Sequence, residues 1–256
     1  VWVDDSLPKP LKPGAKPALA DSELLTILIW DGLTEPHTTL KDIYTWIGRE
    51  YTDCFPRLPA YQNFVAQCHR LLPVLMQLLR ATLSTAAPLR FADSTMLPVC
   101  KPVRIDRHRV ARGVAAFGKN WQGWHYGFKL HASIDAQGRF AALYFTPANE
   151  ADVLQLKHLV NSQTNIVVAD AGYTAKVTQR HIWRDFRCIV ISPPRPKQIW
   201  VMAEWQHLLL QMRPKIEAAF GKLKERAHFV SSFPRSVRGY FVHYLRVLLG
   251  YQMANS

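Results

Sequence analysis

The chain has 256 residues, of which 48% are hydrophobic, and this combination is typical of a folded globular protein rather than a disordered one. It contains no run of eighteen apolar residues, so no membrane span and no membrane partner are expected. The N-terminal stretch has no signal-peptide pattern, because charges and prolines interrupt it. The four cysteines include no Cys-x-x-Cys pair, which argues against a zinc cluster or a disulfide framework and favours a reducing cytoplasm.

The charge is unevenly distributed along the chain. Residues 1–87 contain 8 Lys and Arg against 9 Asp and Glu, whereas residues 88–256 contain 24 against 10. A basic excess confined to one part of a chain indicates a polyanionic partner for that part, and nucleic acid is the simplest one.

The first third of the chain has a helical pattern. A Pro- and Lys-rich arm at 7–20 precedes three predicted helices at 21–33, 38–51 and 61–83, the last with a break or kink at Pro73. We therefore expect a small all-helical N-terminal region, 1–87. Three amphipathic helices are typical of a packed bundle, and a helix-turn-helix that binds DNA ends is the alternative.

After residue 87 the hydrophobic period changes to that of strands and helices in alternation. The pattern predicts the following elements: a strand at 88–95, a hairpin of strands at 124–135 and 138–149, a helix at 150–161, a strand at 165–170, a helix at 174–186, a strand at 187–194, and helices within 201–229 and 236–253. This order predicts an α/β domain over 88–256 with a mixed sheet, onto which the last helix packs.

Two aspartates follow apolar strand residues, Asp93 in "RFADST" and Asp170 in "VVADAGY". If the two strands are neighbours, the carboxylates meet at one edge of the sheet, where a divalent cation would relieve their repulsion. Glu217, in "RPKIEAAFGKLK", is the natural third ligand. The alternative is structural: an Asp after a strand is often a turn former or helix cap, and Glu217 would then be an ion-pair partner of Arg213 or Lys224.

Five blocks of the sequence resemble signature blocks of bacterial insertion-sequence transposases of the DDE type, with the closest resemblance to the insertion sequence 982 family. They are "FADSTMLPVC", "GWHYGFKLHASID", "TPANEADV", "VVADAGY" and "RPKIEAAFGKLK", and they occur in the order typical of that family. The resemblance implies a ribonuclease-H-like fold, a mixed five-stranded sheet flanked by helices. It also implies metal-dependent DNA strand cleavage and strand transfer at element ends, in a bacterial, cytoplasmic and nucleoid-associated protein.

The resemblance further implies roles for individual residues. Asp93, Asp170 and Glu217 would be the catalytic carboxylates and would hold two Mg²⁺ or Mn²⁺ ions, with Asp93 between them. Relatives often carry a Y-x2-R-x3-E-x6-K pattern, of which Arg213, Glu217 and Lys224 are present, while Leu210 replaces the Tyr. Arg213 and Lys224 would then contact DNA phosphates. Pro214 leaves two possibilities, because a helix either starts near it or kinks there.

The segment 101–129 is strongly basic and carries two tryptophans near its end. Its predicted DNA-contacting residues are Arg104, Arg107, Arg109, Arg112, Lys119, Trp121 and Lys129. Trp121 is the predicted stacking residue, because Trp124 alternates with the core face of its strand. A solvated loop whose tryptophans cover the core is the alternative.

Three functions remain open from the sequence. The first is a transposase that joins element ends to target DNA as a homodimer in a synaptic complex. The second is an inactive or domesticated relative that only binds DNA, which the Leu210 and Pro214 departures keep open. The third is a related metal-dependent nuclease that cuts without joining.

Overall fold

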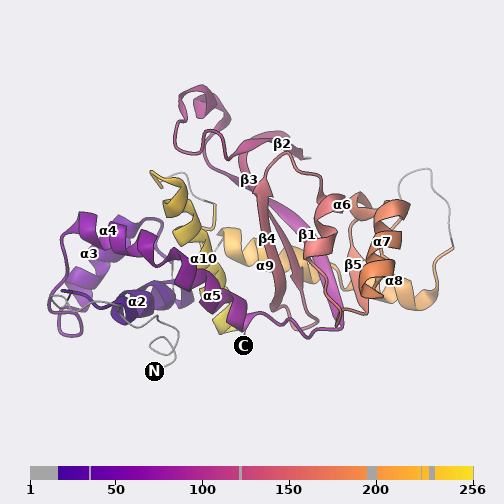
Figure 1. Ribbon diagram of the computed structural model, residues 1–256, viewed down its shortest axis with the longest axis horizontal. Coiled ribbons are helices and arrows are strands. Elements are labelled where there is room, and N and C mark those ends of the chain that lie inside the picture. Colours follow the sequence, from indigo (N-terminus) through magenta and orange to yellow (C-terminus); the bar gives the residue numbers. More distant parts are fainter. Residues whose placement is uncertain are drawn as a thin grey trace. The chain divides into compact units, whose positions relative to one another are not determined.

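The structure is a computed structural model that describes residues 17–34, 36–120, 123–194, 201–225, 227–230 and 234–255. Its contacts divide the chain into two compact units (Figure 1). The sheet unit spans 83–222, and the helical unit combines 1–82 with 223–254. The chain therefore returns to the N-terminal helices after the sheet is complete, so the units do not coincide with the ranges 1–87 and 88–256.

The helical unit is built from five described helices. They are α2 (Asp21–Leu33), α3 (Leu40–Glu50), α4 (Tyr61–Arg70), α5 (Leu72–Thr82) and α10 (Val237–Ala254). The break expected near Pro73 is present, because α4 ends at Arg70 and Pro73 is the second residue of α5, where its missing N–H costs no helical hydrogen bond. A reciprocal cap between Thr39 and Asp42 starts α3.

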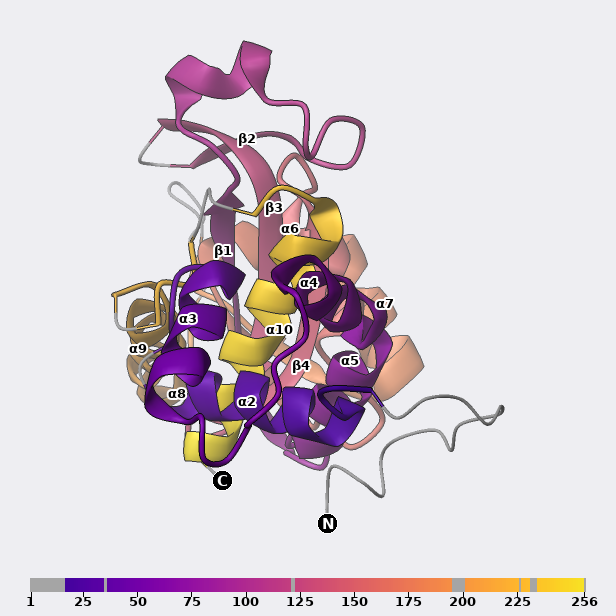
Figure 2. The same ribbon diagram turned by 90° about the vertical axis from the view of Figure 1, so that its left-hand side faces the viewer.

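The last helix, α10, is the centre of the helical unit (Figure 2). It packs mainly against α2 and α5 rather than on the sheet, which corrects the expectation from the sequence. The reason is a close crossing of α2 and α10: a Cβ added to Gly250 would lie 2.1 Å from the carbonyl carbon of Gly32. Two glycines that meet in this way let the helix backbones touch, and twelve residues of α10 are buried as a result.

The sheet unit contains six strands, β1 (Leu89–Pro98), β2 (Ala116–Asn120), β3 (Gly123–Ile134), β4 (Phe140–Pro147), β5 (Ile166–Ala169) and β6 (Ile189–Ile191). Five of them run in the order β4-β3-β1-β5-β6, and the short β2 pairs with the start of β3. The strands β4, β3 and β1 pair antiparallel, whereas β1, β5 and β6 pair parallel. The sequence predicted the mixed sheet but missed β2.

Short helices connect and cover the strands. They are the 3-10 helix η1 (Pro102–Arg107), α6 (Asp152–Gln155), η2 (Leu156–His158), η3 (Ala171–Tyr173), α7 (Lys176–Phe186), α8 (Glu204–Gln211) and α9 (Pro214–Glu225). The single helix expected over 150–161 is therefore two short pieces, and the region 201–229 contains two helices separated at Pro214. Pro214 is the first residue of α9. Of the two possibilities that the sequence left open, a helix therefore starts at Pro214 and does not kink there.

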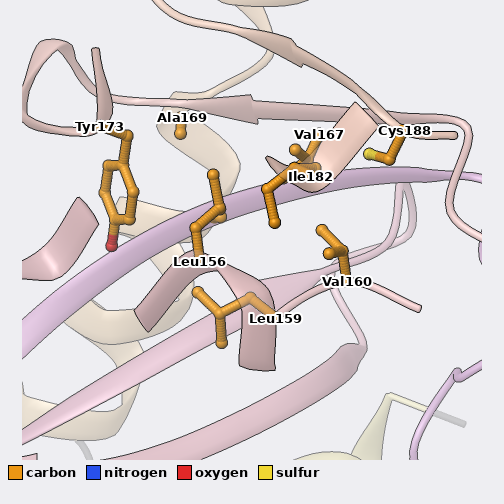
Figure 3. Packing of buried hydrophobic residues seen from close by; sticks show 9 residues of the cluster. Leu156, Leu159, Val160, Val167, Ala169, Tyr173, Ile182 and Cys188 are labelled. Carbon is orange, nitrogen blue, oxygen red and sulfur yellow. The ribbon is translucent and has the colours of Figure 1, made fainter. Parts of the chain in front are cut away.

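One face of the sheet is closed by a buried cluster between β5, η2 and α7 (Figure 3). Leu156 and Leu159 approach from the η2 side and Ile182 from α7, and they surround Val167 of β5. These side chains are at most 1% exposed, so the strand that leads to Asp170 is held in a dry interior. All four cysteines are free thiols, and Cys54 is exposed whereas the other three are buried.

Candidate active site

The pairing register of β1 and β5 places the two aspartates beside each other. The two strands run parallel, and their last paired residues are Ala92 and Ala169. The residue that follows each of these is the aspartate, Asp93 in β1 and Asp170 directly after β5. Corresponding residues of neighbouring parallel strands lie side by side, so both carboxylates are at the point where the parallel pairing ends.

The local structure differs at the two aspartates. Strand β1 does not end at Asp93 but continues to Pro98, because β3 remains paired with it up to Gly127; the expected strand at 88–95 was too short. Asp170 does end its strand and caps η3. Each carboxylate accepts a hydrogen bond from the next backbone N–H, at 2.8 Å from Ser94 and 2.7 Å from Ala171. These bonds orient one oxygen of each group.

The third acid is joined to the first through an arginine. Arg213 immediately precedes α9 and donates from one guanidinium nitrogen to Asp93 Oδ2 at 3.3 Å. Its other terminal nitrogen donates to Glu217, one turn further along the chain. Glu217 is half exposed, whereas the Arg213 and Asp93 side chains are about one-fifth exposed. The ion pair between Glu217 and Arg213, considered as an alternative from the sequence, is therefore present.

The electrostatics of Asp93 reflect this crowding. Burial raises the pKa of its carboxyl to about 6, and the negative charges of Asp170 and Glu217 act in the same direction. The Ser94 N–H and the Arg213 guanidinium oppose the rise. The site thus brings three acids close enough to influence one another, and a cation stabilises their charged forms.

A buried polar network next to Asp93 includes Lys129, which the sequence predicted as a DNA contact, and two residues that the sequence did not assign to the site. Lys129 of β3 is 7% exposed; its Nζ donates to Asp152 at 2.9 Å and to the Glu150 carbonyl at 2.8 Å. His131 faces Ser94 in the β1–β3 register and lies 3.6 Å from Asp152. The signals in the sequence were that Lys129 and His131 lie inside the block "GWHYGFKLHASID" and Asp152 inside the block "TPANEADV". Lys129 is engaged within the protein, so we leave it out of the DNA-contacting set.

The rest of the basic segment is at the surface. Arg104 and Arg107 lie in η1, Arg109 and Arg112 follow it, and Lys119 is in β2; all five side chains are exposed. Trp121 lies outside the described residues. Trp124 is 60% exposed with Lys119 Nζ 5.7 Å from its ring centroid, so the expectation that it packs in the core was wrong.

The remaining predicted DNA contact is Lys224, which lies in the last turn of α9 and is exposed. Arg213, the other cation of the Y-R-E-K pattern, is only partly exposed and is engaged by two acids. The structure therefore separates the predicted contacts into cations that are exposed at the surface and one cation that is held by the carboxylates.

The donor set agrees with a hard cation, although the described residues contain no group of three or more His, Cys, Asp and Glu side chains gathered closely enough to hold one. Carboxylate oxygens are the ligands that Mg²⁺ prefers in proteins. Asp93 and Glu217 already share a cationic partner in Arg213. The chemistry of the acids thus fits a divalent ion. In this structure the guanidinium of Arg213 is the cation that Asp93 and Glu217 share.

A sheet ordered β4-β3-β1-β5-β6, with acidic residues at its centre and a further acid on a later helix, is typical of the ribonuclease-H-like fold. The sequence model of the family described as "Transposase DDE domain" matches residues 83–237. The chain belongs to this family. Its function is accordingly of the transposase or nuclease type, and transposases act on DNA. No described helix is long and apolar enough to cross a membrane.

Proposed function

We propose that this protein cleaves DNA strands at the ends of an insertion element and joins them to target DNA, with Asp93, Asp170 and Glu217 as its catalytic carboxylates. The observation that supports this most directly is the register of β1 and β5, which puts Asp93 and Asp170 side by side, together with the Arg213 bridge to Glu217. A protein that only bound DNA would have no use for three acids facing phosphates.

Each residue has a distinct task in this proposal. Asp93 and Asp170 hold the divalent ions from rigid positions, since each is oriented by a backbone N–H. Two Mg²⁺ or Mn²⁺ ions, when bound, would activate water or a 3′-hydroxyl and stabilise the leaving oxygen. Glu217 completes the ligand set. Arg213, released from the acids, binds a phosphate oxygen of the strand that is cut.

The exposed cations of the basic segment supply affinity rather than chemistry. Arg107, Arg109 and Arg112 follow one another closely and project from the connection between β1 and β2. Contacts of this kind neutralise backbone phosphates without reading bases. They would bind DNA on either side of the scissile phosphate.

Two copies of the chain would act together, because two element ends have to be brought to one target. Analytical ultracentrifugation with end DNA tests this part of the proposal. A complex with two protein chains and two DNA ends is expected, and a complex that stays at one chain per end under cleaving conditions would contradict it.

The activity itself is tested with purified full-length chain, Mg²⁺ or Mn²⁺, and labelled DNA that carries the sequences flanking its own coding region. We expect cleaved ends and joined products, both abolished in Asp93→Asn. Binding without cleavage would identify a DNA-binding relative, and cleavage without joining would identify a nuclease. Either result would overturn the proposed strand transfer.

A further inference from the structure

The helical unit contains a cavity of about 560 Å³, a volume in the range of pockets that hold small ligands. Its walls come from the start of α3, from α4, and from the segment that enters α10, elements that lie beside one another within this unit (Figure 2). Lys41, Tyr61, Val65 and Arg235 line it, so cationic and apolar groups face the same space.

The exposed side chains that line the cavity carry a net positive charge. The described lining residues include one Lys, two Arg and two His, and no Asp or Glu. Arg246 is buried and paired with the equally buried Asp31. Burial lowers the pKa of both histidines, that of His243 to about 4, so neither supplies the positive charge at neutral pH. The excess charge is therefore that of Lys41 and Arg235, which are exposed and make no ion pair with any residue in the described ranges.

Lys41 is held in place by aromatic rings rather than by an acid. Its Nζ lies 4.9 Å from the centroid of the Tyr61 ring and 5.3 Å from that of Tyr44. The neighbouring carboxylate of Asp42 is committed to the start of α3, where it accepts from the Thr39 N–H at 3.1 Å and from its hydroxyl at 2.7 Å. The ammonium group is thus preorganised and remains available to an anion.

We propose that this cavity binds one unpaired nucleotide of the DNA, with its phosphate between Lys41 and Arg235 and its base against Tyr61 and Val65. The inference rests on the proposed function, since DNA is the polyanion. A cavity of this volume with an apolar wall and a cationic rim suits a base that has left the duplex, whereas a duplex backbone would need only the rim. The helical unit would then recognise a frayed or overhanging element end.

The test measures binding of fluorescently labelled DNA without metal, so that nothing is cleaved. One probe is a blunt duplex, and the other carries a short single-stranded overhang. We expect the full-length protein to bind the overhang probe more tightly. The double variant Lys41→Gln, Arg235→Gln should bind it about tenfold or more weakly, with a salt dependence flatter by about 0.7 log unit for each phosphate that is no longer neutralised.

Two further variants keep the test decisive. Tyr61→Leu retains an apolar wall and should weaken overhang binding by about 5- to 100-fold, with little effect on the blunt probe. Arg49→Gln, Arg57→Gln removes two exposed cations of the N-terminal region that do not line the cavity and should bind like the unmodified protein. It is the matched control for charge.

The outcomes separate this inference from the proposed function. If the unmodified protein cleaves DNA but the Lys41, Arg235 and Tyr61 variants bind both probes normally, the cavity proposal fails and the enzyme assignment stands. Equal weakening on both probes would show a backbone contact without a nucleotide in the cavity and would also overturn it. The cavity proposal would also be overturned if a free deoxynucleotide bound the protein as tightly as the overhang probe does. If the protein binds the overhang through these residues but never cleaves DNA, the cavity proposal stands and the assignment of the protein as an enzyme is refuted.

Discussion

Arg213 connects acids that the sequence places far apart, and its side chain is the most informative single group of the site. It lies 120 residues from Asp93 and four residues from Glu217, and donates to both. The guanidinium therefore neutralises part of the charge that a divalent ion would otherwise balance. Two residue-scale predictions follow from this position, one for the arginine and one for the glutamate.

Replacing Arg213 with Met should tighten Mn²⁺ binding in the absence of DNA. The carboxylates of Asp93 and Glu217 would have no cationic partner, and a partly exposed ion pair of this kind is worth about 1 kcal/mol, or roughly fivefold in affinity. Free Mn²⁺ measured by electron paramagnetic resonance reports the change. Arg184→Met, which breaks an exposed pair with Asp185 on α7, is the control. Unchanged or weaker Mn²⁺ binding in Arg213→Met would show that the arginine does not compete with the ion.

Glu217→Gln distinguishes a metal ligand from a simple ion-pair partner. If Glu217 is a metal ligand, the substitution should reduce the cleavage rate by a factor of about 10² to 10⁴, because metal stabilisation of the leaving oxygen is worth several kcal/mol. Metal-free DNA binding should be equal or slightly tighter, since one negative charge near phosphate is removed. As a partner of Arg213 alone, it should cost under about 1 kcal/mol of stability and leave cleavage nearly intact. Asp185→Asn serves as the control, and cleavage close to normal would refute the ligand assignment.

At the scale of elements, two features govern behaviour: the contact of α2 with α10, and the basic connection between β1 and β2. The first is a packing constraint between backbones, because neither Gly32 nor Gly250 has room for a Cβ. The second is an exposed set of charges whose effect depends on ionic strength. They lead to one prediction for stability and one for binding.

Gly250→Ala should destabilise the protein by about 3 kcal/mol, because the added methyl would overlap the backbone of α2 and the two helices would have to separate. Gly221→Ala is a matched control in α9, where an added Cβ meets nothing within 4 Å. It should stabilise by about 0.5–1 kcal/mol, since alanine restricts the unfolded chain and favours helix. Urea unfolding measures both. Equal effects from the two substitutions would mean that α2 and α10 do not cross at these glycines.

Neutralising Arg107, Arg109 and Arg112 to Gln should weaken DNA binding and reduce its salt dependence by about 0.9 log unit for each phosphate that these residues neutralise. The three side chains are exposed, so folding should be unaffected. A variant with Lys157, Arg180 and Arg184 changed to Gln removes the same charge from other exposed positions of the sheet unit. If both triple variants lowered the slope equally, the effect would be one of net charge and not of direct binding to phosphates.

At the scale of the whole molecule, acid is expected to destabilise the helical unit, because this unit buries a neutral histidine at its centre. His243 Nε2 donates to the His228 carbonyl at 2.9 Å, and Nδ1 accepts from Arg246 at 3.0 Å. Arg246 is paired in turn with Asp31 of α2. Both ring nitrogens of the uncharged imidazole are therefore hydrogen-bonded. A second proton would have to bind Nδ1, where it would meet the donor group of Arg246.

Lowering the pH from 7 to 5 should therefore destabilise the helical unit by about 2 kcal/mol. Burial lowers the pKa of His243 to about 4, whereas the unfolded chain binds this proton near its ordinary pKa of about 6.5. Between these values the unfolded state holds more protons, so stability decreases as pH falls. Hydrogen-exchange protection of α10, corrected for the intrinsic rate, measures it. The decrease should disappear in His243→Gln, and a decrease of the same size in that variant would assign it to another group.

Most elements of the fold could be predicted from the sequence because they depend on local patterns, whereas the catalytic role of the three acids stays a prediction. The β-branched run before Asp170, the alternating strand at 124–135 and the apolar period of 21–33 each specify an element without reference to the rest of the chain. The same information also led to errors, two of which concern how far a pattern extends. Trp124 alternates correctly but lies where β3 extends beyond its buried part, and the 150–161 pattern was longer than the helix that forms.

The tertiary structure alone decided which distant groups meet. Strand pairing placed Asp93 beside Asp170, and the chain path brought Arg213 onto Asp93, and neither contact has a local signal. The contact of Arg213 with Glu217, four residues further along the chain, does have one. Residues 1–87 have no basic excess by themselves, but the segment 223–254, which belongs to the same unit as residues 1–82, contains five Lys and Arg and one Glu. Arg235 thereby lines the same cavity as Lys41. Periodicity determines elements because burial acts on neighbouring turns and strand residues, whereas a site depends on long-range packing that no short window of sequence contains.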